Sequence, residues 1–261
     1  MMSLRFLVPL FLLSLARLFA QGNYEVQVYP GQVQDPGTTM IELHSNFTAQ
    51  GSKAADGVLG TDHQQHETIE ITQGWNKWFE TGFYIFTSMQ SGEGWQWVGD
   101  HIRPRVAIPE DWKWPVGLSL SMEFGYQRYR FSPDTWTLEI RPIIDKQIGR
   151  LYLDFNPTFD RSFHGPSVSE GVVFSPNVKV GWNFTKKIQG GLEYYGSLGP
   201  VTGFDPLRDQ EQQIVPSIDV DFGPQWEFNF GVGVGITQAT DHILIKAIVG
   251  RRFGKVRKPS D

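Results

Sequence analysis

Three basic side chains stand two residues apart between residues 101 and 105. His101, Arg103 and Arg105 would share one face of an extended strand, because successive side chains of a strand point to opposite sides. Such a row can attract anionic solutes, or it can pair with carboxylates on a facing strand, Glu123 among them. Of these two interpretations we favour the pairing with Glu123.

Two other clusters contain residue types that bind metals or catalyse reactions. The stretch Asp62–Glu67 (DHQQHE) holds metal-binding side chains, but it falls in the longest expected loop and no second cluster accompanies it in the sequence. Ser162 and His164 lie two residues apart, without a Gly-x-Ser-x-Gly motif or an assignable orienting acid. We therefore predict no metal, no cofactor and no catalytic residue, and keep an outer-membrane lipid hydrolase as the least favoured alternative.

The elements that must position these residues are strands. Apolar and polar side chains alternate in segment after segment, and no helical periodicity is long enough to indicate a helix. The alternation is clearest near the C-terminus, where Glu227 and Asn229 oppose Trp226, Phe228, Phe230, Val232, Val234 and Ile236. Each segment therefore has one apolar face and one polar face.

The segments are more typical of a membrane barrel than of a soluble sandwich. They are about 9–13 residues long, which is the length that tilted membrane strands need. Aromatic residues such as Trp75, Trp112 and Trp182 lie near segment ends, as in an interfacial belt, and short and long connections alternate. The sequence predicts an all-β protein, a transmembrane antiparallel up-and-down β-barrel of about 12 strands. Local irregularities are expected at five prolines inside the strands, namely Pro104, Pro142, Pro157, Pro176 and Pro216.

With the apolar faces toward lipid, the polar faces line the lumen. The lumen-lining candidates are Glu42, His44, Glu70, Glu80, His101, Arg103, Arg105, Glu123, Glu139, Arg141, Asp154, Lys179, Glu193, Asp219, Glu227 and Lys246. They could form a polar passage that selects a solute, or neutralising pairs that close the barrel. About 12 strands lies between barrels filled by side chains and open porins of roughly 16–18 strands. Pairing of the charges across facing strands would distinguish the two.

The ends of the chain predict export. Residues 1–20 have a positive start at Arg5, an apolar core and a cleavage-like Leu18-Phe19-Ala20, which together indicate a secretory signal peptide. Residues 21–37 are polar and rich in Gly and Pro, and we expect a periplasmic lead-in there. The barrel would occupy residues 38–253, and residues 254–261 would form a short basic tail.

Composition excludes several classes of function. The chain has 23 basic and 28 acidic residues, and loss of Arg5 and Arg17 with the signal leaves 21 basic residues and a net charge of −7. No basic face is apparent, so we predict no nucleic-acid partner. The absence of cysteine excludes a disulfide framework, a thiolate metal site and a cysteine-linked lipid anchor.

Several short motifs add a family resemblance. They are Gly74-Trp75-Asn76 at a tight turn, Glu123-Phe124-Gly125, the segment Leu192–Gly196 and the terminal Val249–Phe253. On these motifs, residues 38–253 resemble the bacterial outer-membrane barrels of the transporter family associated with phenol-degradation pathways. The resemblance implies a barrel that moves small organic molecules, and it supplies no catalytic residues. The tail after Phe253 departs from the usual pattern of ending on the aromatic residue.

We therefore expect a protein of the bacterial outer membrane that allows passive passage of small solutes, apolar or aromatic ones included, through a narrow polar lumen. The alternative is a closed structural or adhesion barrel whose extracellular loops bind partners. The expected partners are membrane lipids, a small-molecule solute and the outer-membrane assembly machinery.

Overall fold

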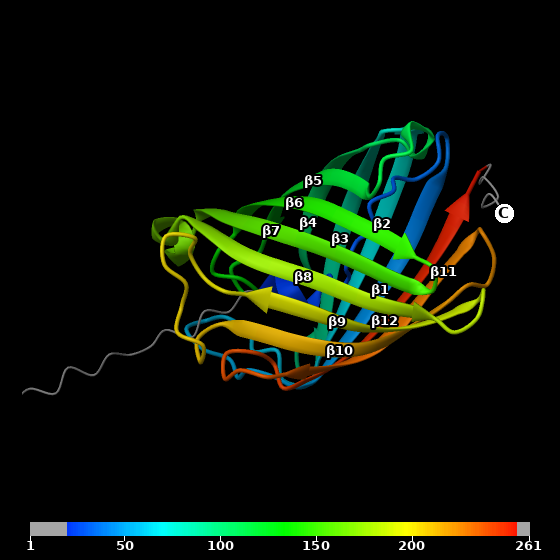
Figure 1. Cartoon of the computed structure of the whole chain (residues 1–261). Helices are drawn as coiled ribbons and strands as arrows, with labels where there is room; N and C mark the ends of the chain where they lie inside the picture. Colours follow the sequence, from blue (N-terminus) through cyan, green and yellow to red (C-terminus); the bar gives the residue numbers. More distant parts are fainter. Residues whose placement is uncertain (1–19, 255–261) are drawn as a thin grey trace, which may run out of the picture.

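Twelve strands close into one barrel in the computed structural model, which describes residues 20–254 (Figure 1). The strands are β1 (Thr39–Gln50), β2 (Gln64–Asn76), β3 (Phe79–Gln90), β4 (Gly94–Ala107), β5 (Gly117–Gln127), β6 (Trp136–Ile148), β7 (Leu151–His164), β8 (Val172–Asn183), β9 (Ile188–Ser197), β10 (Glu211–Val220), β11 (Trp226–Gly235) and β12 (Ile243–Phe253). The short 3-10 helices are η1 (Ala20–Asn23), η2 (Glu110–Trp112) and η3 (Pro166–Glu170). Within residues 20–254, no helix is long and apolar enough to cross a membrane. Apart from Ala20 and Gly254, the expected signal peptide and basic tail lie outside the described residues.

Every strand pairs antiparallel with its neighbours in the chain, and β1 closes the barrel against β12. Leu43 of β1, for example, lies opposite Ile69 of β2 on one side and Val249 of β12 on the other. Closure gives each strand a hydrogen-bonded partner on both sides, so no strand edge is left free. The predicted all-β, up-and-down barrel of about 12 strands is confirmed.

The barrel wall is apolar outside and polar inside. In β1, Ile41 and Leu43 are 41% and 43% exposed, whereas Glu42 and His44 are buried. A soluble protein would bury the apolar face and expose the charged one, because water solvates charge and not hydrocarbon. The reversed arrangement is the one that suits a barrel surrounded by lipid.

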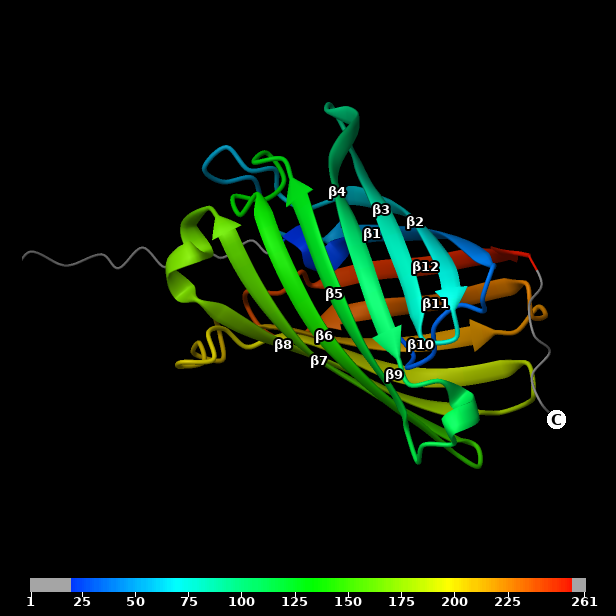
Figure 2. The same ribbon diagram turned by 90° about the horizontal axis from the view of Figure 1, so that it is seen from above.

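The two ends of the barrel differ in their connections. The end that holds Thr39 and Phe253, called here the turn end, carries connections 77–78, 108–116, 149–150, 184–187 and 221–225. The opposite end, called the loop end, carries connections 51–63, 91–93, 128–135, 165–171, 198–210 and 236–242. The connection 91–93 is the shortest at the loop end, because β3 and β4 continue as a hairpin that projects beyond the barrel rim (Figure 2).

Strand pairing is interrupted where prolines occur. Between β6 and β7 the register passes directly from Ile140↔Phe159 to Ile144↔Phe155, and Pro142 and Pro157 fall in this gap. The gaps between β4 and β5 and between β10 and β11 contain Pro104 and Pro216. Proline has no N–H to donate, so these rungs of the ladder are missing. Pro176 likewise has a partner only on its β7 side, since the β8–β9 register begins at Asn177. The predicted irregularities are therefore confirmed at all five positions.

The largest departure from the sequence prediction concerns the expected periplasmic lead-in. Residues 23–36, called here the N-terminal segment, run through the inside of the barrel (Figure 1, dark blue). Asn23 donates to Asp241 near the loop end, and the N–H of Gln34 donates to Glu80 at the start of β3, near the turn end. The segment therefore passes along the lumen and then enters β1. A stretch rich in Gly and Pro was expected to be solvated; here the barrel wall supplies the contacts that water would otherwise make.

Candidate functional site

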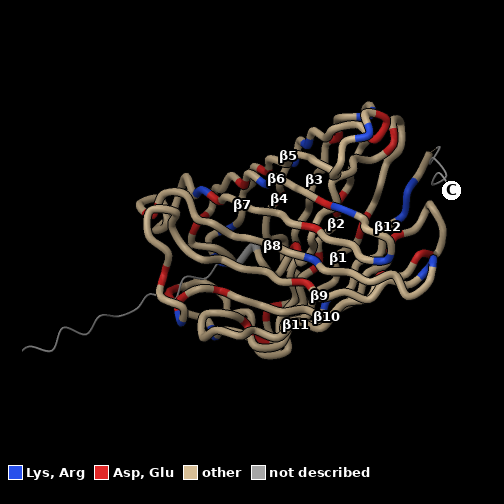
Figure 3. The backbone as a smooth tube through the Cα atoms, viewed as in Figure 1, with Lys and Arg blue, Asp and Glu red and all other residues tan. Residues whose placement is uncertain are grey.

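The structure places all sixteen lumen-lining candidates on the inner face of the wall. Fourteen are buried, and Asp219 and Glu227 are half-buried. Figure 3 shows that charged positions occur along the strands as well as in the connections. Nine of the sixteen are acids, five are Lys or Arg and two are His. That they line a conducting passage remains a proposal, taken up below.

One ion-pair group is centred on Arg103 of β4. Its Nη2 donates to Glu70 Oε1 at 2.6 Å and to Thr72 Oγ1 at 3.1 Å, and its Nη1 lies 3.4 Å from Glu80 Oε1. The guanidinium also lies over the ring of Tyr29, 5.0 Å from the centroid. The buried guanidinium of Arg103 thus joins strands β2, β3 and β4 to the N-terminal segment.

The predicted row of basic residues divides among several partners. His101 Nδ1 contacts Glu123 Oε1, which agrees with the favoured pairing. Arg105 instead donates to the carbonyl oxygen of Pro30 at 2.8 Å and lies 3.5 Å from Glu80. Only His101 therefore pairs with Glu123, and the two arginines face β2, β3 and the N-terminal segment.

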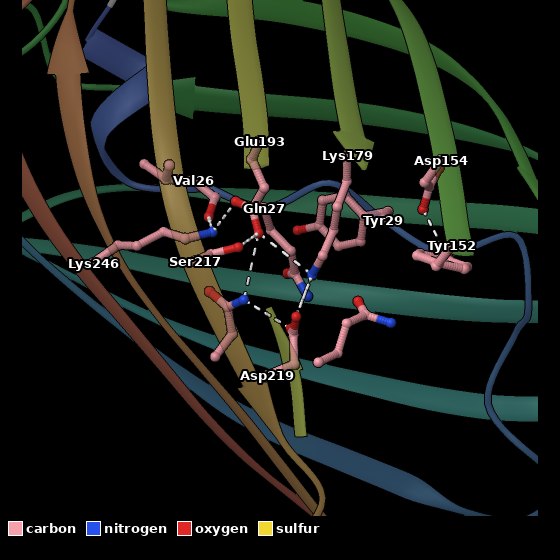
Figure 4. Close-up of polar contacts among 12 residues, drawn as sticks. Val26, Gln27, Tyr29, Tyr152, Asp154, Lys179, Glu193, Ser217, Asp219 and Lys246 are labelled. Carbon is pink, nitrogen blue, oxygen red and sulfur yellow. Dashed lines mark hydrogen bonds and ion pairs between the residues drawn. The ribbon is translucent and has the colours of Figure 1, made fainter. Parts of the chain in front are cut away.

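A second ion-pair group joins β8, β9, β10 and β12 (Figure 4). Lys179 Nζ donates to Asp219 Oδ2 at 2.8 Å and lies 3.4 Å from Glu193 Oε1. Lys246 Nζ donates to the other oxygen of Glu193 and, at 2.9 Å, to the carbonyl oxygen of Val26. Further inner ion pairs join Arg141 to Glu139, Arg252 to Glu227 and His44 to Glu70.

This pairing bears on the question that the sequence left open. Lumen charges do pair across strands, as Arg103 of β4 does with Glu70 of β2 and Lys246 of β12 does with Glu193 of β9. A buried charge without a partner would cost roughly several kcal/mol, which explains why acids and bases interlock inside the barrel.

The N-terminal segment is held through its backbone as well as through its side chains. Thr68 Oγ1 donates to the carbonyl oxygen of Tyr24 at 2.9 Å, and Asn156 brackets Tyr29 by accepting from its N–H and donating to its carbonyl oxygen. These inner side chains satisfy backbone groups that a strand ladder would otherwise satisfy. The sequence did carry one signal: apolar and polar residues alternate in Tyr24–Tyr29 (YEVQVY), although the run is too short and isolated to assign to the lumen.

A cavity of about 190 Å³ adjoins the N-terminal segment at the loop end. Its charged lining comprises the acids Glu25, Asp134, Glu139, Asp160, Glu211 and Asp241 and the bases Arg141 and Arg161. Acids outnumber bases, so the potential in the cavity favours cations over anions.

Gly125 of β5 makes room for the His101 ring. A Cβ built at Gly125 would lie 1.7 Å from His101 Cδ2. We predict that Gly125→Ala displaces the ring and lowers stability by about 1–3 kcal/mol, as overpacking does. Urea unfolding of the refolded barrel measures this. Gly203→Ala is the control, since nothing lies within 4 Å of a Cβ there, and equal stability of the two variants would contradict the prediction.

The residues of the two small clusters singled out in the sequence point in different directions. His66 belongs to β2 and not to the loop; it points inward to Thr48, whereas Glu67 accepts from Ser45 on the outer side. Asp62 remains in the loop, where the N–H of Gly51 lowers the pKa of its carboxyl. His164 lies 2.8 Å from Thr135 Oγ1, and among the described residues no hydrogen bond joins it to Ser162.

Comparison with known proteins gives a family and a fold. The family model described as "Putative MetA-pathway of phenol degradation" matches residues 98–245, more than half of the chain. The COG4313 outer membrane channel from Pseudomonas putida F1 is similar in structure, with a TM-score of 0.59 at 9% identity, over 87% of this chain and 100% of that chain. The NanC porin gives a TM-score of 0.53 at 8% identity, over 83% and 100%. At these identities the likeness shows the fold alone. No curated protein matches the chain.

Proposed function

The chain belongs to this family of phenol-degradation proteins, and we propose that it is a channel of the bacterial outer membrane for small solutes, closed by its own N-terminal segment. The observation that carries the proposal is that a separate stretch of chain, which is not part of the barrel wall, lies in the lumen. The likeness in fold to an outer membrane channel and a porin supports it. The turn end would face the periplasm and the loop end the outside, as in outer-membrane barrels.

The contacts of the segment suit reversible displacement. It is joined to the wall by side-chain hydrogen bonds, which water can replace when the segment leaves, and by ring contacts, whose loss exposes apolar surface to water. A hydrogen bond of this kind contributes about 0.5–1.5 kcal/mol net. Several such bonds keep the segment in place most of the time, whereas the strand ladder of the wall stays intact when it moves.

Displacement would also uncover an apolar patch on the inner wall. Tyr24 packs against Phe86, with ring centroids 5.5 Å apart, in a cluster with Tyr84, Val98 and Phe131. Aromatic rings offer stacking and edge contacts to an aromatic solute. Small aromatic molecules are therefore included among the proposed solutes, in keeping with the family description, and the protein would catalyse no reaction on them.

A closed structural or adhesion barrel is the second candidate, because the lumen charges are paired. The two functions differ in one respect. In a channel the N-terminal segment moves, and in a purely structural barrel it is a permanent part of the core.

Cysteine cross-linking tests the proposal, since the chain has no cysteine of its own. Asn46 donates to the carbonyl oxygen of Asn23 at 2.9 Å, so cysteines replace Asn23 and Asn46. In a planar bilayer we expect silence from the oxidised double variant and recovery of stepwise conductance on reduction.

The two single-cysteine variants serve as controls and should conduct in both redox states. Conductance of the verified cross-linked form would show that the segment is not the closing element. Silence of every variant, with the barrel shown to be folded by heat-modifiable gel mobility, would favour the structural barrel.

A further inference from the structure

Three titratable side chains meet where the N-terminal segment touches β4 and β5. Glu25 belongs to the segment, His101 to β4 and Glu123 to β5. One potential ligand atom from each lies within 4.8 Å of the other two, and all three residues are buried. We propose that these residues form a binding site for a divalent transition-metal cation, best suited to Zn²⁺, that clamps the N-terminal segment to the barrel wall.

The chemistry of the three groups supports such a site. An imidazole with two carboxylates is a donor set that Zn²⁺ accepts, with His nitrogen and carboxylate oxygen at about 2.0–2.2 Å and a fourth position for water. His101 Nδ1 already faces Glu123 Oε1. Small rotations of Glu25 and Glu123 would bring three ligand atoms around one ion.

Neighbouring groups orient the ligands. Tyr29 Oη donates to Glu25 Oε1 at 2.7 Å, and both side chains are buried. Gly125 leaves the space in which the His101 ring lies. Outer contacts of this kind fix ligand direction in metal sites.

The local charge favours a cation. Besides Glu25 and Glu123, the acids Glu139 and Asp160 approach the same part of the lumen, and Arg141 is paired with Glu139 at 2.7 Å. Like charges that are buried together are stabilised when a cation joins them. Glu25 also lines the acidic cavity at the loop end, so an ion from outside reaches the site through that cavity.

The positions of the three ligands link metal binding to the position of the N-terminal segment. One ligand lies on the N-terminal segment and two on the wall, so the complete site exists only while the segment is in the lumen. A ligand that binds one of two states stabilises that state. Zn²⁺ should therefore keep the barrel closed. This clamp rests on the proposed channel function, whereas Zn²⁺ binding itself does not.

Calorimetric titration of the refolded mature chain with Zn²⁺, after treatment with EDTA, tests binding. We expect one site per chain, with affinity reduced at least about tenfold in both Glu25→Gln and His101→Gln. Glu227→Gln and His63→Gln are matched controls, because these residues lie on the inner wall and in an outer loop away from the cluster, and they should bind as the parent does. No Zn²⁺ binding by the parent, or undiminished binding by Glu25→Gln, would overturn the site.

Bilayer recording then tests the clamp separately. Zn²⁺ should lower the opening frequency of the parent, EDTA should restore it, and Glu25→Gln should not respond. If Zn²⁺ binds but does not change the opening frequency, the clamp is refuted while the binding site stands. If the parent never opens under any condition, the channel proposal and the clamp fail together, while the titration still decides whether the site exists.

Discussion

Deletion of residues 23–34 is expected to turn a barrel that opens rarely into one that conducts almost continuously. The deleted stretch occupies the lumen and is not part of the strand wall, so its loss removes the obstruction and leaves the twelve-stranded ladder in place. A minor open state is typically populated at about 0.1–10%, so the open fraction should rise by roughly ten- to a thousandfold. Planar-bilayer recording measures it, with gel mobility confirming that the barrel has formed.

Graded variants separate this effect from a general loss of structure. Tyr29→Ala removes a buried ring that contacts Arg103 and Arg141, and it should give an intermediate open fraction. Gln32→Ala alters an exposed residue of the same segment and should leave conductance unchanged. With nine acids against five bases among the inner candidates, the deleted barrel should also prefer cations. A folded deletion variant that remains silent would refute the channel proposal.

The second large effect is expected at Arg103. Replacement by Met removes the cation that Glu70 and Glu80 share, and it leaves two carboxylates buried without it. Breaking a buried ion pair in this way costs about 3–5 kcal/mol, since the remaining charge stays desolvated. Guanidinium unfolding of the refolded barrel, followed by tryptophan fluorescence, measures the change in the free energy of unfolding.

Arg251→Met is the matched control. Arg251 is exposed on the outer face of β12, where its guanidinium lies over the rings of Trp226 and Phe253, and its loss should cost less than about 1 kcal/mol. Adding Glu70→Gln to Arg103→Met should recover part of the lost stability, because one uncompensated charge is removed. Equal effects of the two arginine substitutions would contradict a central role for Arg103.

The sequence by itself determined the wall of the barrel. A strand has a side-chain period of two, so the alternation in stretches such as Trp226–Ile236 already states which residues share a face, and segment length and aromatic placement show that the apolar face meets lipid. For this reason the strand number, the antiparallel order and the inward direction of residues such as Glu42, Arg103 and Lys246 could all be predicted.

The tertiary structure decided which inner residues meet. Partners across the lumen depend on how the closed sheet curves and staggers, and neither property is encoded in one strand. Thus Lys246 of β12 reaches Glu193 of β9, and Arg103 of β4 reaches Glu70 of β2. The pairing of His101 with Glu123 was predictable because β4 and β5 are neighbours in the sheet.

Only the tertiary structure could place the N-terminal segment. Its polar composition with Gly and Pro is compatible with exposure to solvent. It is equally compatible with a lumen in which the side chains of Thr68, Asn156 and Arg105 donate hydrogen bonds to its backbone. Local sequence cannot distinguish these environments, because backbone groups accept hydrogen bonds from water and from inner side chains alike. Closure of the barrel around the segment therefore created the meeting of Glu25 with His101 and Glu123.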